Sequence, residues 1–410
     1  MNEDIVFADL HLHSSYARAC SEKMNLEVLS QQAKIKGLNI LGTGDFTHPK
    51  WLEELKQKLK FNNGIYEFNE MNFVLQAEIS LIYKQDFKQR RIHHLILAEN
   101  FEVVDQINEF LDKKGRRDYD GRPIFGFSSV ELAEEMMKIS KAIMIIPAHA
   151  WTPWYGIFGS MSGFDSLKEC FQEKTKYIYS IETGLSSDPQ MNWRLSFLDG
   201  ITLISNSDAH SPWPHRLGRE ANAFSMKEIN YQNIVESIRT RKDFLFTIEV
   251  DPGYGKYHFD GHRNCNFSCD PKESARIKSL CPKCGKILTI GVLNRVQELA
   301  DRKEGYNPDN VPDYKSILPL HEIIAYFYNG NLFSTKVKDI YELLIEKFGN
   351  EFNILLNVEK EELKKIVDAK VAEMIIKNRE GKTKIIPGYD GVYGKLIEDK
   401  EQKSMKEFVG

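Results

Sequence analysis

Short apolar runs alternate with segments of helical period through the first 250 residues of the chain. An apolar run of four to eight residues is typical of a buried strand, whereas apolar residues spaced three or four apart indicate a helix. The runs predict seven strands: Ile5–Leu10, Leu38–Gly42, Phe73–Leu81, Ile92–Ala98, Ala142–Pro147, Tyr177–Glu182 and Ile201–Ser205. The helical segments are Leu26–Lys36, Trp51–Lys60, Val103–Lys113 and Val130–Ser140. Strands alternating with helices predict an α/β domain with a parallel sheet, either a closed barrel or a doubly wound one.

The alternation stops near residue 250, and two regions of different character follow. Four cysteines fall between positions 265 and 284, and helical segments then recur at Leu288–Arg302, Ile317–Phe327, Val337–Phe348 and Lys360–Lys377. We therefore expect three domains: 1–250, a cysteine-rich domain at 251–302, and a helical domain at 303–410.

Composition narrows the class of protein. Hydrophobic residues make up 42% of the 410 positions, enough for a sizeable core. An apolar stretch near 18 residues and a signal peptide are both missing, so we expect a soluble, cytoplasmic protein that does not contact a membrane. Net charge is −4, and only the cysteine-rich region is net positive. Bulk charge thus does not announce a nucleic-acid partner, although a local groove could still bind one.

Metal-binding residue types gather at the carboxyl ends of six predicted strands. Alternate residues of a strand share a face, so His11 and His13 point the same way. The other strand ends carry Asp45 and His48, Glu78, His93 and His94, His149, and Asp208 and His210. Barrel enzymes collect their chemistry at this end of the strands, which favours the barrel.

The ligand types indicate the chemistry. Imidazole and carboxylate suit Zn²⁺, Mn²⁺ or Fe²⁺, and a carboxylate such as Glu78 can bridge two ions. Paired ions activate water and orient a phosphate, so phosphoester hydrolysis is the expected reaction. Adjacent His93 and His94 face opposite ways, so only one can be a ligand, and we expect His94. His48, before Pro49, could instead cap a helix or turn.

The cysteines are spaced as Cys265-x3-Cys269-x11-Cys281-x2-Cys284. Four thiolates fit a tetrahedral zinc ion, and all four positions would then be filled, so we expect one structural zinc. Replacement of a cysteine by His258 or His262, and an iron–sulfur cluster, are the alternatives.

These motifs resemble a known superfamily. DLHLHS, GTGD with a nearby histidine, a strand glutamate, a strand-end histidine and SNSDAH resemble the polymerase and histidinol phosphatase (PHP) superfamily. The resemblance implies a distorted (β/α)7 PHP barrel with a trinuclear metal centre. It is closer still to the endonuclease Q family of DNA repair nucleases, through PAHAWTPWYGIFGSMSGFDSL, IETGLSSDPQMNWRL, SNSDAHSPWPHRLGREAN, the four cysteines and PGYDGVYGKL.

The resemblance implies a metal-dependent endonuclease that cuts DNA 5′ to uracil, hypoxanthine, xanthine or an abasic site, and a C-terminal domain that contacts DNA. It implies two or three barrel metals, Zn, Mn or Mg. One metal would be bound by His11, His13, Glu78 and Asp208, a second by Glu78, His149 and His93 or His94, and a third by Asp45 or His48 with His210. Phe46 and Arg18 occupy places where the superfamily often has ligands, which counts against the third metal.

Residues beside the ligands suggest how DNA would be held. An enzyme that inspects a damaged base takes it out of the helix and holds it between flat side chains, so the candidates for a base pocket are Trp151, Trp154, Tyr155 and Phe158. Some of these could simply belong to the core. Arg216 and Arg219 are candidate phosphate contacts. Asp208, Glu78 and Arg216 are the expected catalytic residues, and Glu182 and Asp188 are expected to orient a histidine ligand.

Two other functions fit parts of the pattern. A small-molecule phosphatase of the PHP type would explain the barrel ligands but gives the two later regions no purpose. A DNA-binding module without catalysis would retain the fold with structural metals only. A replication or repair clamp is a further candidate partner, and we expect a monomer.

Overall fold

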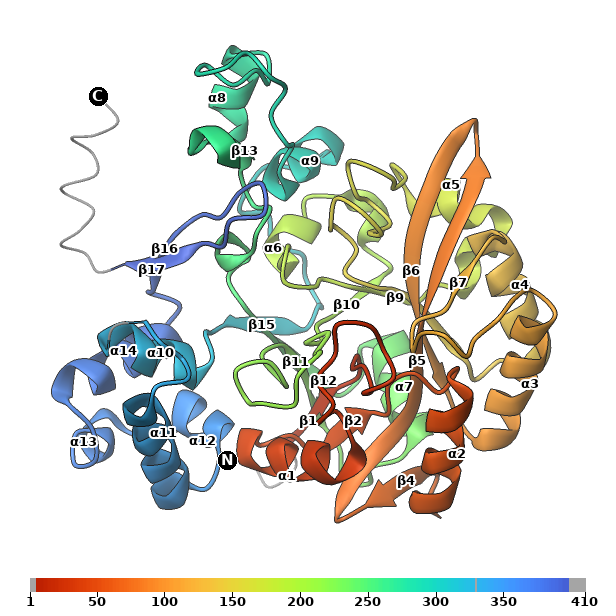
Figure 1. Ribbon diagram of the computed structural model, residues 1–410, viewed down its shortest axis with the longest axis horizontal. Coiled ribbons are helices and arrows are strands. Elements are labelled where there is room, and N and C mark those ends of the chain that lie inside the picture. Colours follow the sequence, from red (N-terminus) through yellow and green to blue (C-terminus); the bar gives the residue numbers. More distant parts are fainter. Residues whose placement is uncertain (1–4, 329, 398–410) are drawn as a thin grey trace.

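The computed structural model describes residues 5–328 and 330–397. A barrel, a cysteine-rich region above it and a group of C-terminal helices to one side are evident in Figure 1. Among the described helices, none has the length and apolar character needed to span a membrane.

Seven strands of the described chain surround the barrel, and each overlaps a strand predicted from the sequence. They are β1 (Ile5–Asp9), β2 (Ile40–Gly42), β5 (Met71–Gln85), β6 (Lys88–Ala98), β8 (Met144–Pro147), β9 (Ser180–Glu182) and β10 (Thr202–Ile204). Strands β1, β2, β5, β6 and β8 are hydrogen-bonded in that order, and β9 pairs with β10. The ring closes where Leu12 bridges Ala209 and the Leu10 N–H donates to Asn206 Oδ1 at 2.8 Å.

The alternating pattern predicted a parallel sheet, but one of the barrel strands runs antiparallel to its neighbours. Strand β6 runs antiparallel to both β5 and β8. Asp86 and Phe87, both with positive φ, form the turn of the long β5–β6 hairpin, so no helix separates these two strands. An antiparallel pair needs only a short turn, whereas a parallel pair needs a crossover.

The sheet also extends past β1 through three strands that the hydrophobic pattern did not reveal. They are β11 (Ala221–Ser225), β12 (Phe244–Glu249) and β15 (Asp313–Ser316). Strand β15 pairs in parallel with β12, so a segment beyond the cysteine-rich region joins the barrel sheet. The sheet therefore continues across the domain boundaries expected at 250 and 302.

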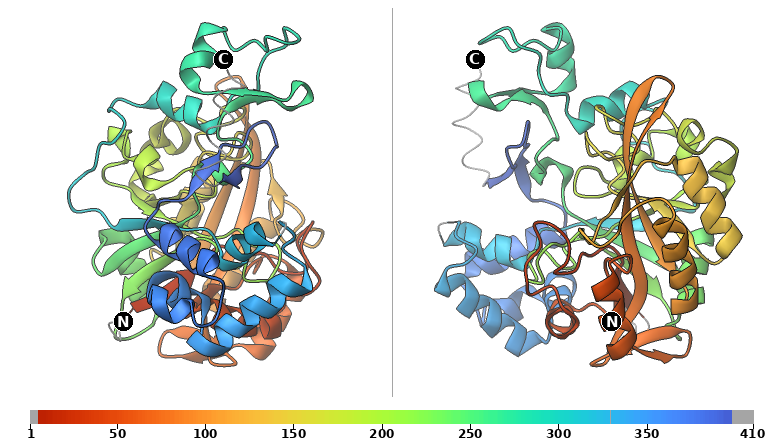
Figure 2. Two further views of the ribbon diagram at one scale, coloured as in Figure 1. Left: turned by 90° about the vertical axis from the view of Figure 1, so that its left-hand side faces the viewer. Right: turned by 45° about the vertical axis from the view of Figure 1, so that its right-hand side comes forward.

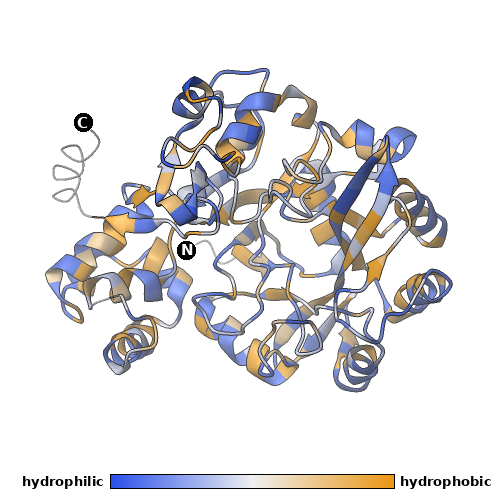
Figure 3. Cartoon of the chain, turned by 45° about the horizontal axis from the view of Figure 1, so that its top comes forward, coloured by the Kyte–Doolittle hydropathy of each residue, from blue (hydrophilic) through white to orange (hydrophobic). Residues whose placement is uncertain are grey.

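Helices cover the barrel and begin at polar caps. They are α1 (Leu26–Lys36), α2 (Pro49–Lys58), α3 (Phe101–Asp112), α4 (Ser129–Ile139) and α7 (Tyr231–Thr240). Side chains of Asn25, Asn100 and Ser128 accept backbone N–H groups at the starts of α1, α3 and α4, as expected for N-cap residues. Hydrophobic and hydrophilic residues alternate along these helices, as Figure 3 shows, so each helix buries one face.

The C-terminal helices pack against α1 through a buried ion pair. This group comprises α10 (Leu320–Phe327), α11 (Thr335–Phe348), α12 (Glu351–Leu356), α13 (Lys360–Leu363) and α14 (Ala369–Arg379). Lys36 Nζ lies 2.8 Å from Glu351 Oε1, and Glu351 Oε2 accepts the Tyr341 hydroxyl at 2.8 Å. Asp368 caps α14, so the single helix predicted at Lys360–Lys377 is two helices. Residues 398–410 of the expected third domain lie outside the described residues.

The last two strands of the described chain lie beside the cysteine-rich region. This region contains β13 (Asp260–His262), β14 (Phe267–Cys269), α8 (Pro271–Arg276) and α9 (Val292–Leu299). The hairpin of β16 (Lys384–Ile386) and β17 (Lys395–Ile397) returns beside it, which Figure 2 shows from two further sides. Gly388 bonds Gly253 and Phe259 through its backbone, and a Cβ on Gly388 would lie 2.0 Å from the Gly255 oxygen. Only glycine permits this close approach.

Short elements complete the fold. They are β3 (Lys60–Asn62), β4 (Ile65–Phe68), β7 (Ile124–Phe125), α5 (Leu167–Phe171), α6 (Pro189–Asn192) and the 3-10 turns η1 (Gln172–Tyr177), η2 (Ser196–Leu198), η3 (Pro252–Tyr254) and η4 (Arg263–Cys265).

Candidate metal centre

Strand ends that are far apart in the sequence bring two ligand groups together in the barrel mouth. The first group is His11, His13, Glu78 and Asp208, and the second is Glu78, His93 and His149. Within each group the ligand atoms lie within 4.8 Å of one another. Glu78 belongs to both groups, which is the arrangement expected of a bridging carboxylate.

Unpartnered buried atoms mark the first group as a cation site. His13 Nε2 lies 3.3 Å from Glu78 Oε2 and 3.1 Å from Asp208 Oδ1. The Nε2 atoms of His11 and His13 and the Oδ1 atom of Asp208 are buried, and they find no hydrogen-bond partner among the described residues. Burying polar atoms without partners is costly, so their convergence fits a divalent metal.

The second group uses the other oxygen of Glu78. His93 Nδ1 lies 2.7 Å and His149 Nε2 lies 3.1 Å from Glu78 Oε1. The two imidazole nitrogens are 3.2 Å apart. Two nitrogens and a carboxylate oxygen in this arrangement suit Zn²⁺ or Mn²⁺.

The expectation that His94 faces the centre is wrong. Its Nε2 atom bonds Ser129 Oγ at 2.8 Å, and its ring lies 5.3 Å from that of Phe171. Strand alternation was correctly used to separate the two histidines, but it cannot tell which face is inside. The structure brings His93 to Glu78 and His149.

Two carboxylates orient the histidines of the first group. Glu182 accepts from His11 Nδ1 at 3.0 Å, and Asp45 Oδ1 accepts from His13 Nδ1 at 3.0 Å. Asp45 Oδ2 is occupied by the N–H and hydroxyl of Ser14. Such bonds fix the tautomer and leave each Nε2 free for a metal. Asp45 is therefore placed as a partner of a ligand, which corrects the expectation that it binds metal itself.

The structure does not assemble the third metal group expected from Asp45, His48 and His210. His48 begins α2 and its ring lies 4.5 Å from that of Tyr16. His210 Nδ1 lies 3.0 Å from the Asp208 backbone oxygen. Among the residues that the structure describes, none of these three belongs to a metal-ligand group.

The carboxylates of the centre are held ionised. Burial raises the pKa of Glu78, but contact with His93, the charge of Arg122 and hydrogen bonds from His11 and His13 outweigh burial and hold that pKa well below its ordinary value. Burial likewise raises the pKa of Asp208, and His11 and His13 bring it below its ordinary range. Ionised carboxylates are what a metal ligand requires.

Backbone strain concentrates at the site. Asp45, His149 and Asp208 have φ values of 43°, 31° and 48°, in the left-handed region that side chains rarely adopt. A Cβ on Gly184 would lie 2.8 Å from His149 Cα, so glycine is needed beside this ligand. Strained residues of this kind cluster at functional sites, where the surrounding fold holds them in place.

A cavity of about 530 Å³ opens above the ligands. Trp154 and Tyr155 line it from the loop after β8, and Tyr257 and Tyr393 line it from the cysteine-rich region and the C-terminal hairpin. Sequence reasoning missed these two tyrosines, because a local pattern does not show that the cysteine-rich region and the terminal hairpin fold back to the mouth of the barrel.

The other two aromatic candidates are core residues. Trp151 is 1% exposed and donates its Nε1–H to Asn192 at 2.8 Å. Phe158 is fully buried against Trp151, with ring centroids 5.0 Å apart. The expectation that Trp151 and Phe158 line a base pocket is thus corrected.

The two candidate arginines line an adjoining crevice rather than the metal cavity. Arg216, Arg219, Tyr254 and Tyr393 line this crevice. Tyr393 also lines the metal cavity, so the crevice and the cavity adjoin. Arg219 donates from Nε and Nη2 to the Ser207 oxygen at 3.2 and 2.9 Å, which holds the strand end that carries Asp208. A catalytic role would require Arg216 to line the metal cavity. It lines the crevice instead, which corrects the expectation that Arg216 is a catalytic residue.

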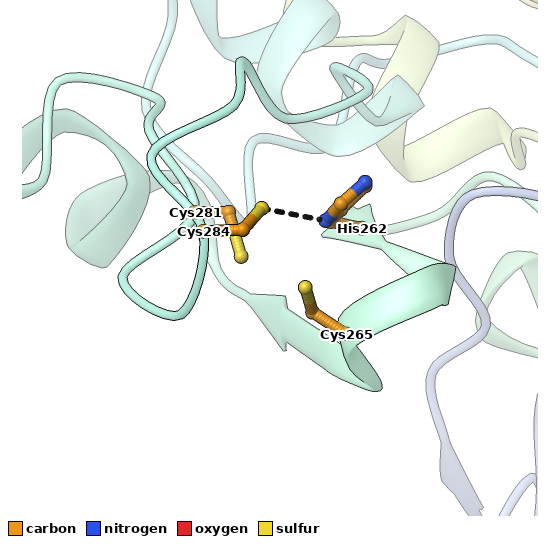
Figure 4. A group of neighbouring side chains, drawn as sticks. All are labelled: His262, Cys265, Cys281 and Cys284. Carbon is orange, nitrogen blue, oxygen red and sulfur yellow. Dashed lines mark hydrogen bonds between the residues drawn. The ribbon is translucent and has the colours of Figure 1, made fainter.

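A third ligand group lies in the cysteine-rich region. His262, Cys265, Cys281 and Cys284 converge in Figure 4, and Cys284 Sγ lies 3.4 Å from His262 Nδ1. Three sulfurs and one nitrogen are a common structural zinc set. Cys269, expected as the fourth thiolate, lies outside this group, although it packs in a small cluster with Leu288 and the ligand Cys281. The β13–β14 hairpin places His262 opposite Phe267 and so brings the histidine to the other cysteines.

Comparisons with known proteins agree with this architecture. Residues 319–382 match a family model described as the MJ0043 C-terminal domain. The protein MJ0043 of Methanocaldococcus jannaschii is 37% identical over 253 residues, which are 60% of this chain and 31% of that protein. The chain therefore spans about a third of the length of that relative.

Two solved structures match nearly the whole chain. One is the lesion-specific endonuclease PfuEndoQ from Pyrococcus furiosus, at a TM-score of 0.87 and 32% identity, covering 98% of this chain and 99% of that one. The other is endonuclease Q in complex with a 27-mer duplex that has an abasic lesion at the active site, at a TM-score of 0.86 and 33% identity, with 97% of each chain covered. Because the likeness extends over barrel, cysteine-rich region and terminal helices alike, the chain belongs to the endonuclease Q family.

Proposed function

We propose that this protein is a metal-dependent DNA repair endonuclease that hydrolyses the phosphodiester bond 5′ to a deaminated base or an abasic site. The lesions are uracil, hypoxanthine, xanthine and the abasic site. The observation that carries the proposal is the shared carboxylate of Glu78 between two buried ligand groups, at the floor of an aromatic cavity. Family membership supports it, because one solved relative holds a duplex with an abasic lesion at its active site.

Two divalent ions fit the barrel ligands. His11, His13, Glu78 and Asp208 would hold one, and Glu78, His93 and His149 would hold the other. Zn, Mn and Mg remain the candidate ions. When bound, such a pair supplies a hydroxide at neutral pH and positive charge for the leaving oxygen.

The protein's own residues prepare the site for this chemistry. Asp45 and Glu182 hold the two histidines of the first group with their Nε2 atoms toward the centre. The flat faces of Trp154, Tyr155 and Tyr257 line the cavity and would receive a base turned out of the helix. Removing a base from the stack costs a few kcal/mol, and least for a damaged or unpaired base, which favours lesions.

Positive side chains in a crevice next to the cavity and in a groove of the C-terminal domain would contact the DNA backbone. Arg216 and Arg219 line the crevice that adjoins the metal cavity. On the C-terminal domain, a groove of about 400 Å³ is bordered by Lys370, Lys377, Lys382 and Lys384. Contacts of this type predict that affinity for DNA falls steeply as salt is raised.

Protein partners and assembly are finer parts of the proposal. A replication or repair clamp as a partner, a monomeric state and a cytoplasmic location stay predictions. Size-exclusion chromatography with light scattering, with and without a purified clamp, tests the first two together.

Cleavage of defined duplexes tests the proposal. The purified protein is incubated with Mg²⁺, Mn²⁺ or Zn²⁺ and a labelled duplex containing one deoxyuridine, one deoxyinosine or no lesion. We expect one nick 5′ to the lesion with a 3′-hydroxyl end, and an intact undamaged duplex. Equal cutting of the undamaged duplex would contradict the lesion-specific claim. Faster turnover of a chromogenic phosphomonoester than of damaged DNA would favour the phosphatase instead.

A further inference from the structure

Arg122 is a cation inside the metal cavity that the strand-end motifs did not reveal. Its Nη1 atom donates to Glu78 Oε2 at 3.0 Å. The side chain is 27% exposed and lines the cavity together with His93, His149 and Asp208. It reaches the centre from the loop that follows α3, whereas the ligands come from β5 and β6 or follow β1, β8 and β10.

The loop that carries Arg122 is anchored next to Asp45, the carboxylate that orients His13. The Arg122 N–H donates to Asp120 Oδ1 at 3.2 Å, and the Gly121 oxygen accepts the Thr47 hydroxyl at 3.1 Å. Gly121 lies so close to Asp45 that an added Cβ would be 2.4 Å from Asp45 Oδ2. The backbone of the loop is therefore packed against Asp45, and the contact with Glu78 holds the guanidinium beside the centre.

Arg122 lines the cavity, and its hydrogen bond with Glu78 uses only part of the donor capacity of its guanidinium. A guanidinium has five N–H donors, and the contact with Glu78 uses one. Within the described chain no second hydrogen bond of this guanidinium is found, although the side chain is mostly enclosed. An enclosed arginine with donors to spare beside a metal cavity is suited to bind an anion, because planar guanidinium groups match the geometry of phosphate oxygens.

We propose that Arg122 is a catalytic residue that donates to a non-bridging oxygen of the scissile phosphodiester, which rests on the proposed function. Arg122 supplies a positive charge beside Glu78 Oε2, and the described residues form no third metal group in the barrel. In the reaction a water oxygen forms the new bond to phosphorus and the P–O3′ bond breaks. The 3′ oxygen takes up a proton, and Arg122 keeps all of its own. Its role is to stabilise the charge that builds up on the phosphoryl oxygens.

A purely structural role is the competing explanation, in which Arg122 only neutralises Glu78. The two roles differ in what an arginine deletion changes. Loss of a catalytic donor slows the chemical step and leaves metal content and DNA affinity nearly unchanged, whereas loss of a structural cation changes metal binding or folding.

The test compares Arg122→Ala with Arg18→Ala in the metal-loaded protein. Arg18 lines the same cavity but is 73% exposed and pairs with Asp120, so it serves as a matched control. For Arg122→Ala we expect the single-turnover cleavage rate on a deoxyuridine duplex to fall about 10²- to 10³-fold, the usual effect of removing one transition-state donor. Metal content by mass spectrometry and the Kd for the duplex should stay close to wild type, and added guanidinium should restore part of the rate.

Each other outcome has a defined meaning. Cleavage by Arg122→Ala at the wild-type rate, or lost metal without rescue by guanidinium, would overturn the role of Arg122 while the proposed function stands. An equal loss in Arg18→Ala would show a general charge effect and would also overturn it. If the wild-type protein does not cut lesion duplexes at all, the proposed function fails, and the role of Arg122 fails with it.

Discussion

The barrel centre and the Cys/His group are two metal-ligand clusters built on opposite principles. In the barrel, the ligands come from the ends of several strands. The Nδ1 atoms of His11 and His13 are hydrogen-bonded to the carboxylates of Glu182 and Asp45. In the cysteine-rich region the four ligands come from a hairpin and a turn within 23 residues of one another, and Cys284 is exposed. The first cluster is positioned by a large fold, whereas the second, with a metal bound, would hold a small fold together.

The difference separates chemistry from stability. The barrel has an extensive core of its own, and its ligands face a cavity of about 530 Å³ where a substrate can bind. The Cys/His group offers the four ligands that a tetrahedral zinc ion would need, and among the described residues the core beside it has Cys269, Cys281 and Leu288 as its buried members. Loss of metal should therefore silence the barrel without unfolding it and should unfold the cysteine-rich region.

The largest expected effect is at Asp208. Asp208→Asn keeps the shape of the side chain but removes the charge that faces His11 and His13. Changing a residue that only hydrogen-bonds to a metal ligand reduces activity by up to about 100-fold. Asp208 is itself a ligand in this account, so we expect cleavage of a deoxyuridine duplex to fall by more than that. The Kd for the same duplex and the melting temperature should change little. Full activity in this variant would contradict the assignment of the centre.

A smaller loss should follow from removing the second metal alone, and adjacent histidines provide the comparison. His93→Ala should lower the metal content of the barrel and reduce cleavage about 10- to 100-fold. His94→Ala instead removes a bond to Ser129 and should cost about 1–3 kcal/mol of stability with normal metal content. Elemental analysis and thermal melting of both variants would show the reverse pattern if His94 were the ligand.

A still milder effect on catalysis is expected at the Cys/His group. Cys281→Ser should release one equivalent of zinc and expose the cysteine-rich region to protease, while residual cleavage persists at high protein concentration. Cys269→Ser is the matched control and should retain that zinc, because Cys269 lies outside the ligand group. Zinc loss in both variants to the same extent would favour four cysteine ligands.

The smallest effect concerns the pH dependence of stability. Burial raises the pKa of Glu249 to about 8, although bonds to Thr247, Thr183 and Ser205 act against it. The folded protein thus holds a proton that an unfolded glutamate releases near pH 4.5. The free energy of unfolding should therefore fall as the pH rises from about 4.5, the pKa of the unfolded glutamate, to about 8, its pKa in the folded protein. Thermal melting between about pH 6 and 9 should show a flatter profile for Glu249→Gln, and an unchanged slope would argue against this residue as the source.

The hydrophobic pattern predicted the seven barrel strands because each contains a run of apolar, mostly buried residues. It did not predict β11 and β12, which extend the sheet past β1, nor β15, whose residues are partly exposed. It also placed a helix after every strand, although the turn at Asp86 and Phe87 joins β5 to β6 directly. Pairing partners depend on contacts across the chain, which a local pattern does not contain.

The candidate site was predictable to the extent that residue type and strand position decide it. His11, His13, Glu78, His149 and Asp208 come together as expected. The choice between His93 and His94 depends on strand register, and the exchange of Cys269 for His262 depends on the pairing of β13 with β14. Arg122 and Tyr393 reach the cavity from a loop and a terminal hairpin, and no spacing rule connects such segments to the strands.

Anomalous diffraction from a crystal of the protein with Mn²⁺ and a lesion-containing duplex tests the central claim most directly. We predict two manganese peaks in the barrel on either side of Glu78, bound by His11, His13 and Asp208 and by His93 and His149. The scissile phosphate 5′ to the lesion should lie against both peaks. A single barrel peak, or a peak bound by His48 or His94, would contradict the shared-carboxylate centre on which the proposed function depends.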